Sequence, residues 1–240
     1  MTLIKPEMKM ADVIHMNFML LPVINRFDIN LGFGDKSIFD LCLEKKIDTD
    51  FFLEIINTFN DEEYFPEKKL RTFDVSLLLQ YLQKTHRYYL TFQIPTIEHL
   101  IDNLLKSCTS SCENLHLISS FFGDYKTELT KHIGREEKTV FPYISRVGQL
   151  YKEKDSVGYL ALSQQYSMKR FTREHDNIDE KLFDLKNILI KYISLPYDSN
   201  LCNAVVFELF RLEKDIKDHS RIEDKILKPV VAEMENALKM

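Results

Sequence analysis

The sequence has little glycine or proline and no tryptophan. Its 240 residues include 6 glycines and 7 prolines. Because these two residue types form most turns and interrupt helices, their scarcity indicates long helices joined by few turns. An excess of positive charge is also missing, since the formal net charge is −5. This charge argues against nucleic acid or an anionic membrane surface as the main partner.

Long hydrophobic runs are absent as well. No stretch approaches the roughly 18 consecutive apolar residues of a membrane-spanning helix. The stretch from Val13 to Ile24 is interrupted by His15, Asn17 and Pro22, so we interpret it as part of an amphipathic helix and not as a signal peptide. The sequence thus predicts a cytoplasmic protein with no membrane partner.

Cysteine is scarce, with four residues in the chain: Cys42, Cys108, Cys112 and Cys202. Reduced thiols without a special role are the ordinary interpretation for a cytoplasmic protein. Cys108 and Cys112 frame the sequence C-T-S-S-C in an expected loop. A redox or metal-binding role of this pair is the alternative.

Residues 1–60 are expected to form a small helical N-terminal domain. Three helices are predicted, over about residues 8–27, 38–46 and 49–56. Ser37 and Asp48 are suitable N-terminal caps for the second and third. So short a unit has a thin core, which we expect to lean on the rest of the protein or on a partner. The charged stretch 61–74, which contains Pro66, is interpreted as a linker.

Residues 75–240 are expected to form a four-helix bundle. Long amphipathic patterns extend over about residues 75–106, 114–153, 157–193 and 199–237. The short connections between them favour antiparallel neighbours, hence an up-down-up-down arrangement, and the fold class is all-α. Pro95, Pro142 and Pro229 fall inside three of these helices, and each is expected to kink its helix or end it early.

Each expected helix of the bundle carries one histidine within its apolar stripe. Two of these histidines are followed four residues later by a glutamate, and the pattern of lone His, His and Glu recurs after 87 to 89 residues. The steps of three and four residues between apolar positions direct all six side chains toward the core. The six residues are His86, His132, Glu136, His175, His219 and Glu223.

A buried pair of glutamates indicates a metal site. An ionised carboxylate in an apolar core costs several kcal/mol or more, as an order of magnitude, unless it is paired or metal-bound. Four imidazoles and two carboxylates, Glu136 and Glu223, would supply two metals with two bridging acids. Mixed imidazole and carboxylate ligation suits iron or manganese, and zinc less well in a paired site. The remaining coordination positions would admit a small ligand such as dioxygen, peroxide, nitric oxide or water.

Several neighbouring residues are assigned by their direction on the helix. Four are candidates to surround the ligands, with surface acids and plain core packing as the alternatives: Glu128, Glu174, Tyr125 and Tyr89. Glu137 and Asp224 lie about 140° from His132 and His219 and are expected to face solvent or a flank. The histidines expected to have no role at the site are His15, His99 and His116.

These motifs resemble the haemerythrin-like (HHE cation-binding) family, and within it the repair-of-iron-centres di-iron proteins (the ScdA/YtfE group). The segments H-I-G-R-E-E-K-T-V-F-P at 132–142 and H-S-R-I-E-D-K-I-L-K-P at 219–229 resemble the family's two His-x-x-x-Glu segments, with Lys228 where an aromatic residue is usual. T-H-R-Y-Y-L-T-F-Q-I-P at 85–95 and R-E-H-D at 173–176 resemble its lone-histidine segments.

The resemblance implies a metal site at the six residues already singled out. It further implies two non-haem iron ions bridged by carboxylates and an oxo group, with manganese or zinc as substitutes, and it places the family's acids near the site at Glu128 and Glu174. The N-terminal domain departs from the family. The expected stretch, F-D-I-N-L-G-F-G-D-K-S, keeps Gly32 and Gly34 but lacks the adjacent cysteines that are usual there.

Three functions are weighed on this basis. The first is a di-iron protein of nitrosative and oxidative stress that helps to repair iron–sulfur clusters, by donating iron or by processing nitric oxide, with iron–sulfur proteins as partners. The second is a non-catalytic sensor that binds dioxygen or nitric oxide and signals through the N-terminal domain, which would otherwise dock a partner or form a homodimer. The third is a structural bundle that has lost its metal, which retention of all six ligand types disfavours. Whether the protein is an enzyme stays open.

Overall fold

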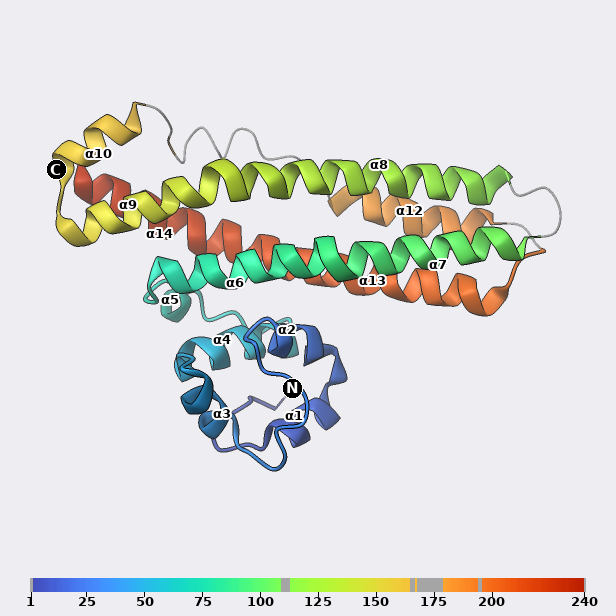
Figure 1. Cartoon of the computed structure of the whole chain (residues 1–240), viewed down its shortest axis with the longest axis horizontal. Coiled ribbons are helices and arrows are strands. Elements are labelled where there is room, and N and C mark those ends of the chain that lie inside the picture. The colour runs from blue at the N-terminus through green and yellow to red at the C-terminus, as the bar shows by residue number, and fades with distance from the viewer. Residues whose placement is uncertain (1, 109–112, 165–166, 168–178, 194–195, 240) are drawn as a thin grey trace.

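The computed structural model describes residues 2–108, 113–164, 167, 179–193 and 196–239. Within these residues all regular structure is helical, as predicted, and strands are absent. A long bundle lies across Figure 1, and a compact group of short helices lies against one side of it. The described residues include no helix that is long and apolar enough to cross a membrane.

The first helical segment of the N-terminal unit is interrupted at Asn17. The prediction of one helix over about residues 8–27 was wrong, because α1 (Met10–Met16) is followed by a 3₁₀ turn η1 (Phe18–Leu20) and α2 (Leu21–Asn25). Asn17 has extended backbone and its side chain accepts a hydrogen bond from the backbone N–H of Met19. This local bond replaces a helical turn, as asparagine side chains commonly do.

The next two helices of this unit begin at the predicted caps. Helix α3 (Ile38–Lys45) starts with a capping box between Ser37 and Asp40. Helix α4 (Thr49–Asn60) starts where Asp48 accepts a hydrogen bond from the backbone N–H of Phe51. These bonds satisfy N–H groups that a helix otherwise leaves unpaired at its first turn.

The stretch 61–74 is more structured than the predicted linker. It contains the short helix α5 (Glu67–Leu70). Leu70 is fully buried, and Phe65 and Phe73 pack against the same core. Three apolar side chains therefore pack this stretch against the core. Its charged residues and its proline had indicated a solvent-exposed linker instead.

Four long helical stretches form the bundle. Three of them are α6 (Val75–Tyr88), η2 (Tyr89–Gln93) and α7 (Ile94–Ser107); α8 (Glu113–Arg135), η3 (Glu136–Val140) and α9 (Phe141–Glu153); and α13 (Ser199–Ile222), η4 (Glu223–Leu227) and α14 (Lys228–Leu238). The fourth is described as α10 (Ser156–Ser163) and α12 (Asp179–Tyr192). Neighbouring stretches run side by side along the bundle (Figure 1).

A π-helical turn precedes each proline inside the bundle. The turns η2, η3 and η4 each close with a hydrogen bond between residues five apart, from Ile94 to Tyr89, from Phe141 to Glu136 and from Lys228 to Glu223. The next residue in each case is proline, which lacks an N–H and whose ring collides with the fourth carbonyl before it in an ordinary α-helix. The wider turn accommodates that ring, so the helices continue where we expected a kink or an early end.

The apolar core has two parts, one on each side of a polar layer. One part joins the N-terminal unit to the bundle around Leu82, Val140 and Ile222. The other fills the opposite half of the bundle around Tyr89, Ile133 and Ile216. Three of the helical stretches contribute apolar residues to both parts. On each of them, the boundary between the two parts falls at a predicted ligand pair or lone histidine. The candidate site therefore lies between two apolar cores, where it is shielded from water at both ends.

Candidate metal centre

Four of the predicted ligands converge inside the bundle. His86 of α6, Glu136 at the start of η3, and His219 and Glu223 at the junction of α13 and η4 are all buried. One nitrogen or oxygen of each lies within 4.8 Å of those of the other three. They come from three helical stretches, so packing of the bundle is what assembles them.

The imidazoles present their Nε2 atoms to the carboxylates. Nε2 of His86 lies 3.3 Å from Oε2 of Glu136 and 3.2 Å from Nε2 of His219. Nε2 of His132 lies 3.2 Å from Oε1 of Glu136, and Nε2 of His219 lies 3.3 Å from Oε1 of Glu223. Each His-x-x-x-Glu pair thus brings a nitrogen and an oxygen to one point, as residues four apart on a helix can do.

The carboxylate oxygens are the atoms that fit a cation. Both oxygens of Glu136 and Oε1 of Glu223 are buried and accept no hydrogen bond from the part of the chain that the structure describes. Buried oxygens without donors are costly, whereas a metal ion would satisfy them. Imidazole and carboxylate together suit iron or manganese. The donor set therefore fits a metal ion, which Glu136, Glu223, His86 and His219 would hold.

The proton balance of the site follows from the same contacts. Burial alone would lower the pKa of His86, but the adjacent carboxylates of Glu136 and Glu137 raise that pKa to about 9. Burial alone would raise the pKa of Glu136, but the adjacent imidazoles of His132 and His86 lower it well below its ordinary value. Glu136 is therefore an anion at neutral pH and ready to bind a cation.

Two residues that sequence reasoning missed hold His86 in place. Nδ1 of His86 donates a hydrogen bond to Oε1 of Glu137 at 2.8 Å, and the His86 ring stacks on Phe141, with centroids 5.3 Å apart and planes within 6°. We expected Glu137 to face solvent or a flank. It does lie at a flank, but there it meets the helix that carries His86. Glu137 of η3 is thus an acid that contacts a ligand imidazole without being a predicted ligand itself.

These residues are those of a known family of cation-binding proteins. The family model of the hemerythrin HHE cation-binding domain matches residues 78–231, more than half of the chain. The chain belongs to the hemerythrin HHE cation-binding family. A comparison with curated proteins finds no match.

A third support of this hemerythrin-type site lies behind His219. The edge of the Tyr89 ring faces His219, with centroids 5.8 Å apart. The Tyr89 hydroxyl donates to Oδ1 of Asp215 at 2.8 Å, and Asp215 in turn forms a 2.5 Å ion pair with Arg26 of the N-terminal unit. Tyr89 was predicted to line the site, but Arg26 and Asp215 are 189 residues apart and no sequence pattern joined them.

The other predicted neighbours of the hemerythrin-type site have different surroundings. Glu128 is exposed and forms an ion pair with the ammonium group of Lys181 in α12. This position at the surface corrects the prediction that Glu128 lies beside an imidazole. Tyr125 is fully buried in the second core. His175 and Glu174 lie outside the described residues. Asp224 is half-exposed and pairs with Lys228 at 2.5 Å.

Among the described residues, the histidines and cysteines without a predicted role do not belong to the cluster of donors at the hemerythrin-type site. The three exposed histidines are His15, His99 and His116. Cys42 and Cys202 are buried and unbridged, and burial raises the pKa of Cys42 to about 11. Cys108 follows α7 as its C-terminal cap and is disulfide-bonded, so the expectation of a reduced thiol is wrong for this residue. Cys112 lies outside the described residues.

Proposed function

We propose that the protein holds two non-haem iron ions, with His86, His132, Glu136, His175, His219 and Glu223 as ligands. The observation that carries this proposal is the convergence of four buried donors from three helical stretches, with carboxylate oxygens that lack hydrogen-bond donors. Family membership supports it, because hemerythrin-type domains usually hold iron. Manganese or zinc would occupy the same donors as substitutes.

The function we favour is repair of iron–sulfur clusters under nitrosative or oxidative stress. The protein would donate iron to damaged clusters or process nitric oxide at its own site, as the repair-of-iron-centres proteins that its motifs resemble do. Six ligands leave coordination positions on two metals open to dioxygen or nitric oxide. Iron–sulfur proteins would be its partners, and the cytoplasm its compartment.

Iron loading without air tests the metal proposal and the reactivity together. We expect two irons per chain and a new optical spectrum after addition of nitric oxide. Glu136→Ala should lose most of the iron, because it removes a buried bridging acid, whereas Glu128→Ala removes an exposed acid and should keep it. A protein with no stoichiometric iron, or with iron that nitric oxide leaves unchanged, would overturn this proposal.

A second candidate function is sensing through the N-terminal unit. The observation that favours it is the continuous contact from Arg26 through Asp215 and Tyr89 to the ring of His219. If ligand binding displaced the His219 ring, the displacement would be passed to Tyr89 through the ring contact, to Asp215 through the hydrogen bond and to Arg26 through the ion pair. The affinity of a docking surface or homodimer interface on the N-terminal unit would then change.

Turnover separates the two functions. Repair by nitric oxide processing consumes the gas, and iron donation transfers metal to an apo iron–sulfur protein. A sensor instead forms a stable adduct, and hydrogen exchange of α2 and α4 should then differ between the free and ligated protein. Unchanged exchange in these helices together with consumption of nitric oxide would reject the sensor.

A further inference from the structure

A groove lies where the N-terminal unit meets the bundle. Its volume is about 640 Å³, and its lining comes from ten residues between Phe18 and Leu31, from residues of α6 and η2, and from Arg211 of α13. This volume is in the range of roughly 300–1,000 Å³ that is typical of sites for small organic molecules. The groove is separate from the metal ligands, none of which lines it.

Apolar side chains of the groove remain exposed. Phe18, Leu31 and Phe92 line it, with relative exposures of 63%, 71% and 56%. Large apolar groups gathered at one concave place are unusual on a soluble surface and commonly mark a binding site. They would favour the apolar body of a ligand.

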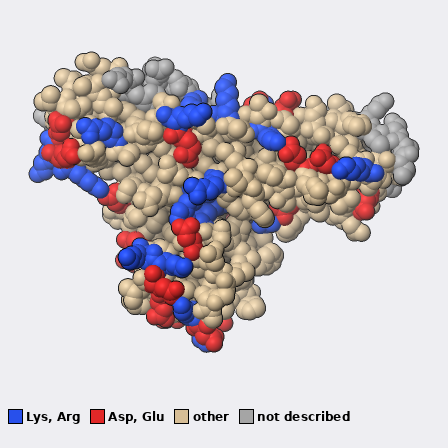
Figure 2. Space-filling view, in the orientation of Figure 1, with Lys and Arg blue, Asp and Glu red and all other residues tan. Residues whose placement is uncertain are grey.

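The charged groups of the groove are mainly cationic. Its lining includes the side chains of Arg26, Lys84, Arg87 and Arg211 but only one acid, Asp28. This differs from the chain as a whole, which is acidic, and from the face shown in Figure 2, where the two charge types are interspersed. The charge of the groove is therefore complementary to an anion.

Arg87 is the cation of the groove that is available to a ligand. Arg26 pairs with Asp215, Lys84 with Asp28 and Arg211 with Glu208. Arg87 is exposed and forms no ion pair with any residue that the structure describes. Its planar guanidinium matches the two oxygens of a carboxylate.

The Tyr88 hydroxyl is a second unused donor in the same groove. It is buried and has no hydrogen-bond partner among the described residues. The Tyr88 ring is held by stacking on Phe92, with centroids 5.5 Å apart, and by the Arg26 guanidinium 4.9 Å from its centroid. A buried donor without an acceptor is costly, and a ligand oxygen would satisfy it.

We propose that this groove binds an amphipathic carboxylate of the fatty-acid type. The carboxylate would accept hydrogen bonds from Tyr88 and Arg87, and the acyl chain would cover Phe18, Leu31 and Phe92. The groove is thus a second ligand site, at the seam that joins the N-terminal unit to the bundle.

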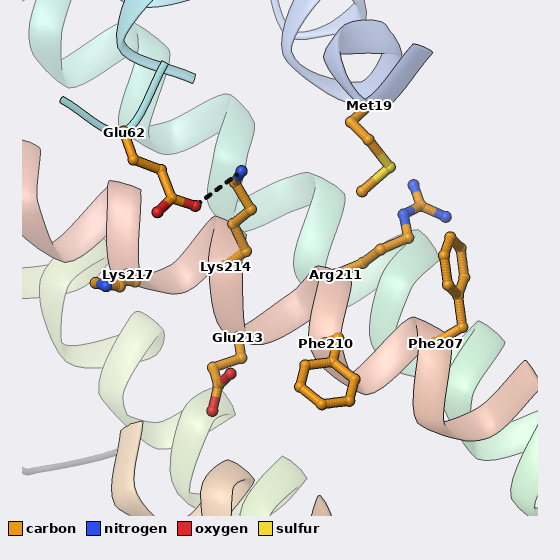
Figure 3. Close-up of a pocket in the computed structure, with 8 residues that line it drawn as sticks. All are labelled: Met19, Glu62, Phe207, Phe210, Arg211, Glu213, Lys214 and Lys217. Carbon is orange, nitrogen blue, oxygen red and sulfur yellow. Dashed lines mark ion pairs between the residues drawn. The ribbon is translucent and has the colours of Figure 1, made fainter. Parts of the chain in front are cut away.

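A neighbouring hollow offers a control. It shares Arg211 with the groove and is lined by Met19, Phe207 and Phe210 together with charged groups (Figure 3). Two acids, Glu62 and Glu213, stand against three cations there, and Figure 3 shows Glu62 paired with Lys214. Its charge is therefore less suited to an anion.

The test is calorimetric titration of the full chain with laurate below its micelle concentration. Dodecyltrimethylammonium, which has the same chain and the opposite charge, is the ligand control. We expect laurate to bind with a stoichiometry of one per chain, and dodecyltrimethylammonium to show no saturable binding. Leu31→Glu and Arg87→Gln should each weaken laurate binding about tenfold, and Tyr88→Phe several-fold, because each removes one contact or adds a like charge.

Matched variants keep the test specific. Leu43→Glu changes a leucine of nearly the same exposure, 68%, elsewhere in the N-terminal unit, Arg146→Gln changes an exposed arginine of α9, and Phe207→Glu changes the neighbouring hollow. All three should bind laurate within twofold of the parent protein, with metal content equal throughout. Equal binding by the Leu31→Glu and Leu43→Glu proteins, equal binding of the cation, or no saturable binding of laurate would overturn the proposal.

Discussion

Nδ1 of His86 lies 2.8 Å from Oε1 of Glu137, although the two residues are 51 positions apart and belong to different helices. Because a carboxylate can only accept, Nδ1 carries a proton, and Nε2 is the nitrogen that faces Glu136 and His219. Metal-binding histidines are commonly fixed in this way by an acid behind them. Glu137 thus prepares His86 for a metal.

Glu137→Ala should weaken metal binding about 10- to 100-fold, because His86 loses the bond that fixes its tautomer and orientation. Competition of Mn²⁺ or Zn²⁺ against a chromophoric chelator measures the affinity. Glu128→Ala removes a surface acid from the same helical stretch and should leave the affinity unchanged. Equal affinities of the two variants would show that Glu137 does not orient His86.

Phe141→Ala should lower the free energy of unfolding by about 3–5 kcal/mol, since it removes a buried ring and leaves a cavity beside His86. Urea denaturation of metal-free protein measures the change without a contribution from metal binding. Phe39→Ala, at a phenylalanine that is 51% exposed, is the control and should cost less than about 1 kcal/mol. A similar loss in both would contradict the packing seen around Phe141.

Arg26→Met should destabilise the protein by about 3 kcal/mol, because Asp215, whose side chain is only 13% exposed, would keep its charge without a partner. The double variant Arg26→Met/Asp215→Asn removes both charges and leaves an amide oxygen for the Tyr89 hydroxyl. It should therefore be more stable than Arg26→Met alone. Thermal and urea unfolding of the four proteins of this cycle give the coupling energy. A coupling near zero would mean that the ion pair does not join the two units energetically.

The metal-free protein should lose stability as the pH rises through about 9. The pKa of His86 is raised from 6.5 in the unfolded chain to about 9 in the folded protein, so its contribution is fully present below pH 6.5 and is lost as the pH passes 9. The loss is at most about 3 kcal/mol. Unfolding free energies of chelator-treated protein between pH 6 and 10 measure it. His86→Gln should show no such slope, and a slope equal to that of the parent protein would assign the effect to another group.

Much of the fold follows from local patterns in the sequence. Ser37 and Asp48 begin helices because their side chains bond the first free N–H groups, which are three residues away. His219 and Glu223 face the core because four residues make little more than one turn, and the apolar steps on either side fix which face is buried. The predicted continuous helix over residues 8–27 failed at Asn17, where one side-chain bond competes with the helix.

Most helices, and the faces that they bury, could be predicted from local patterns, since both depend on neighbours within about four residues. The contacts across those faces come from tertiary packing. Glu137 reaches His86, Arg26 reaches Asp215, and Tyr88 and Arg87 line a groove with Leu31, because helices distant in the chain pack at a particular register. The π turns that begin at Glu136 and Glu223, before Pro142 and Pro229, were likewise not predicted from the sequence. Helical periodicity has no information about the rotation and offset of a neighbouring helix, and these depend on the packing of the whole core.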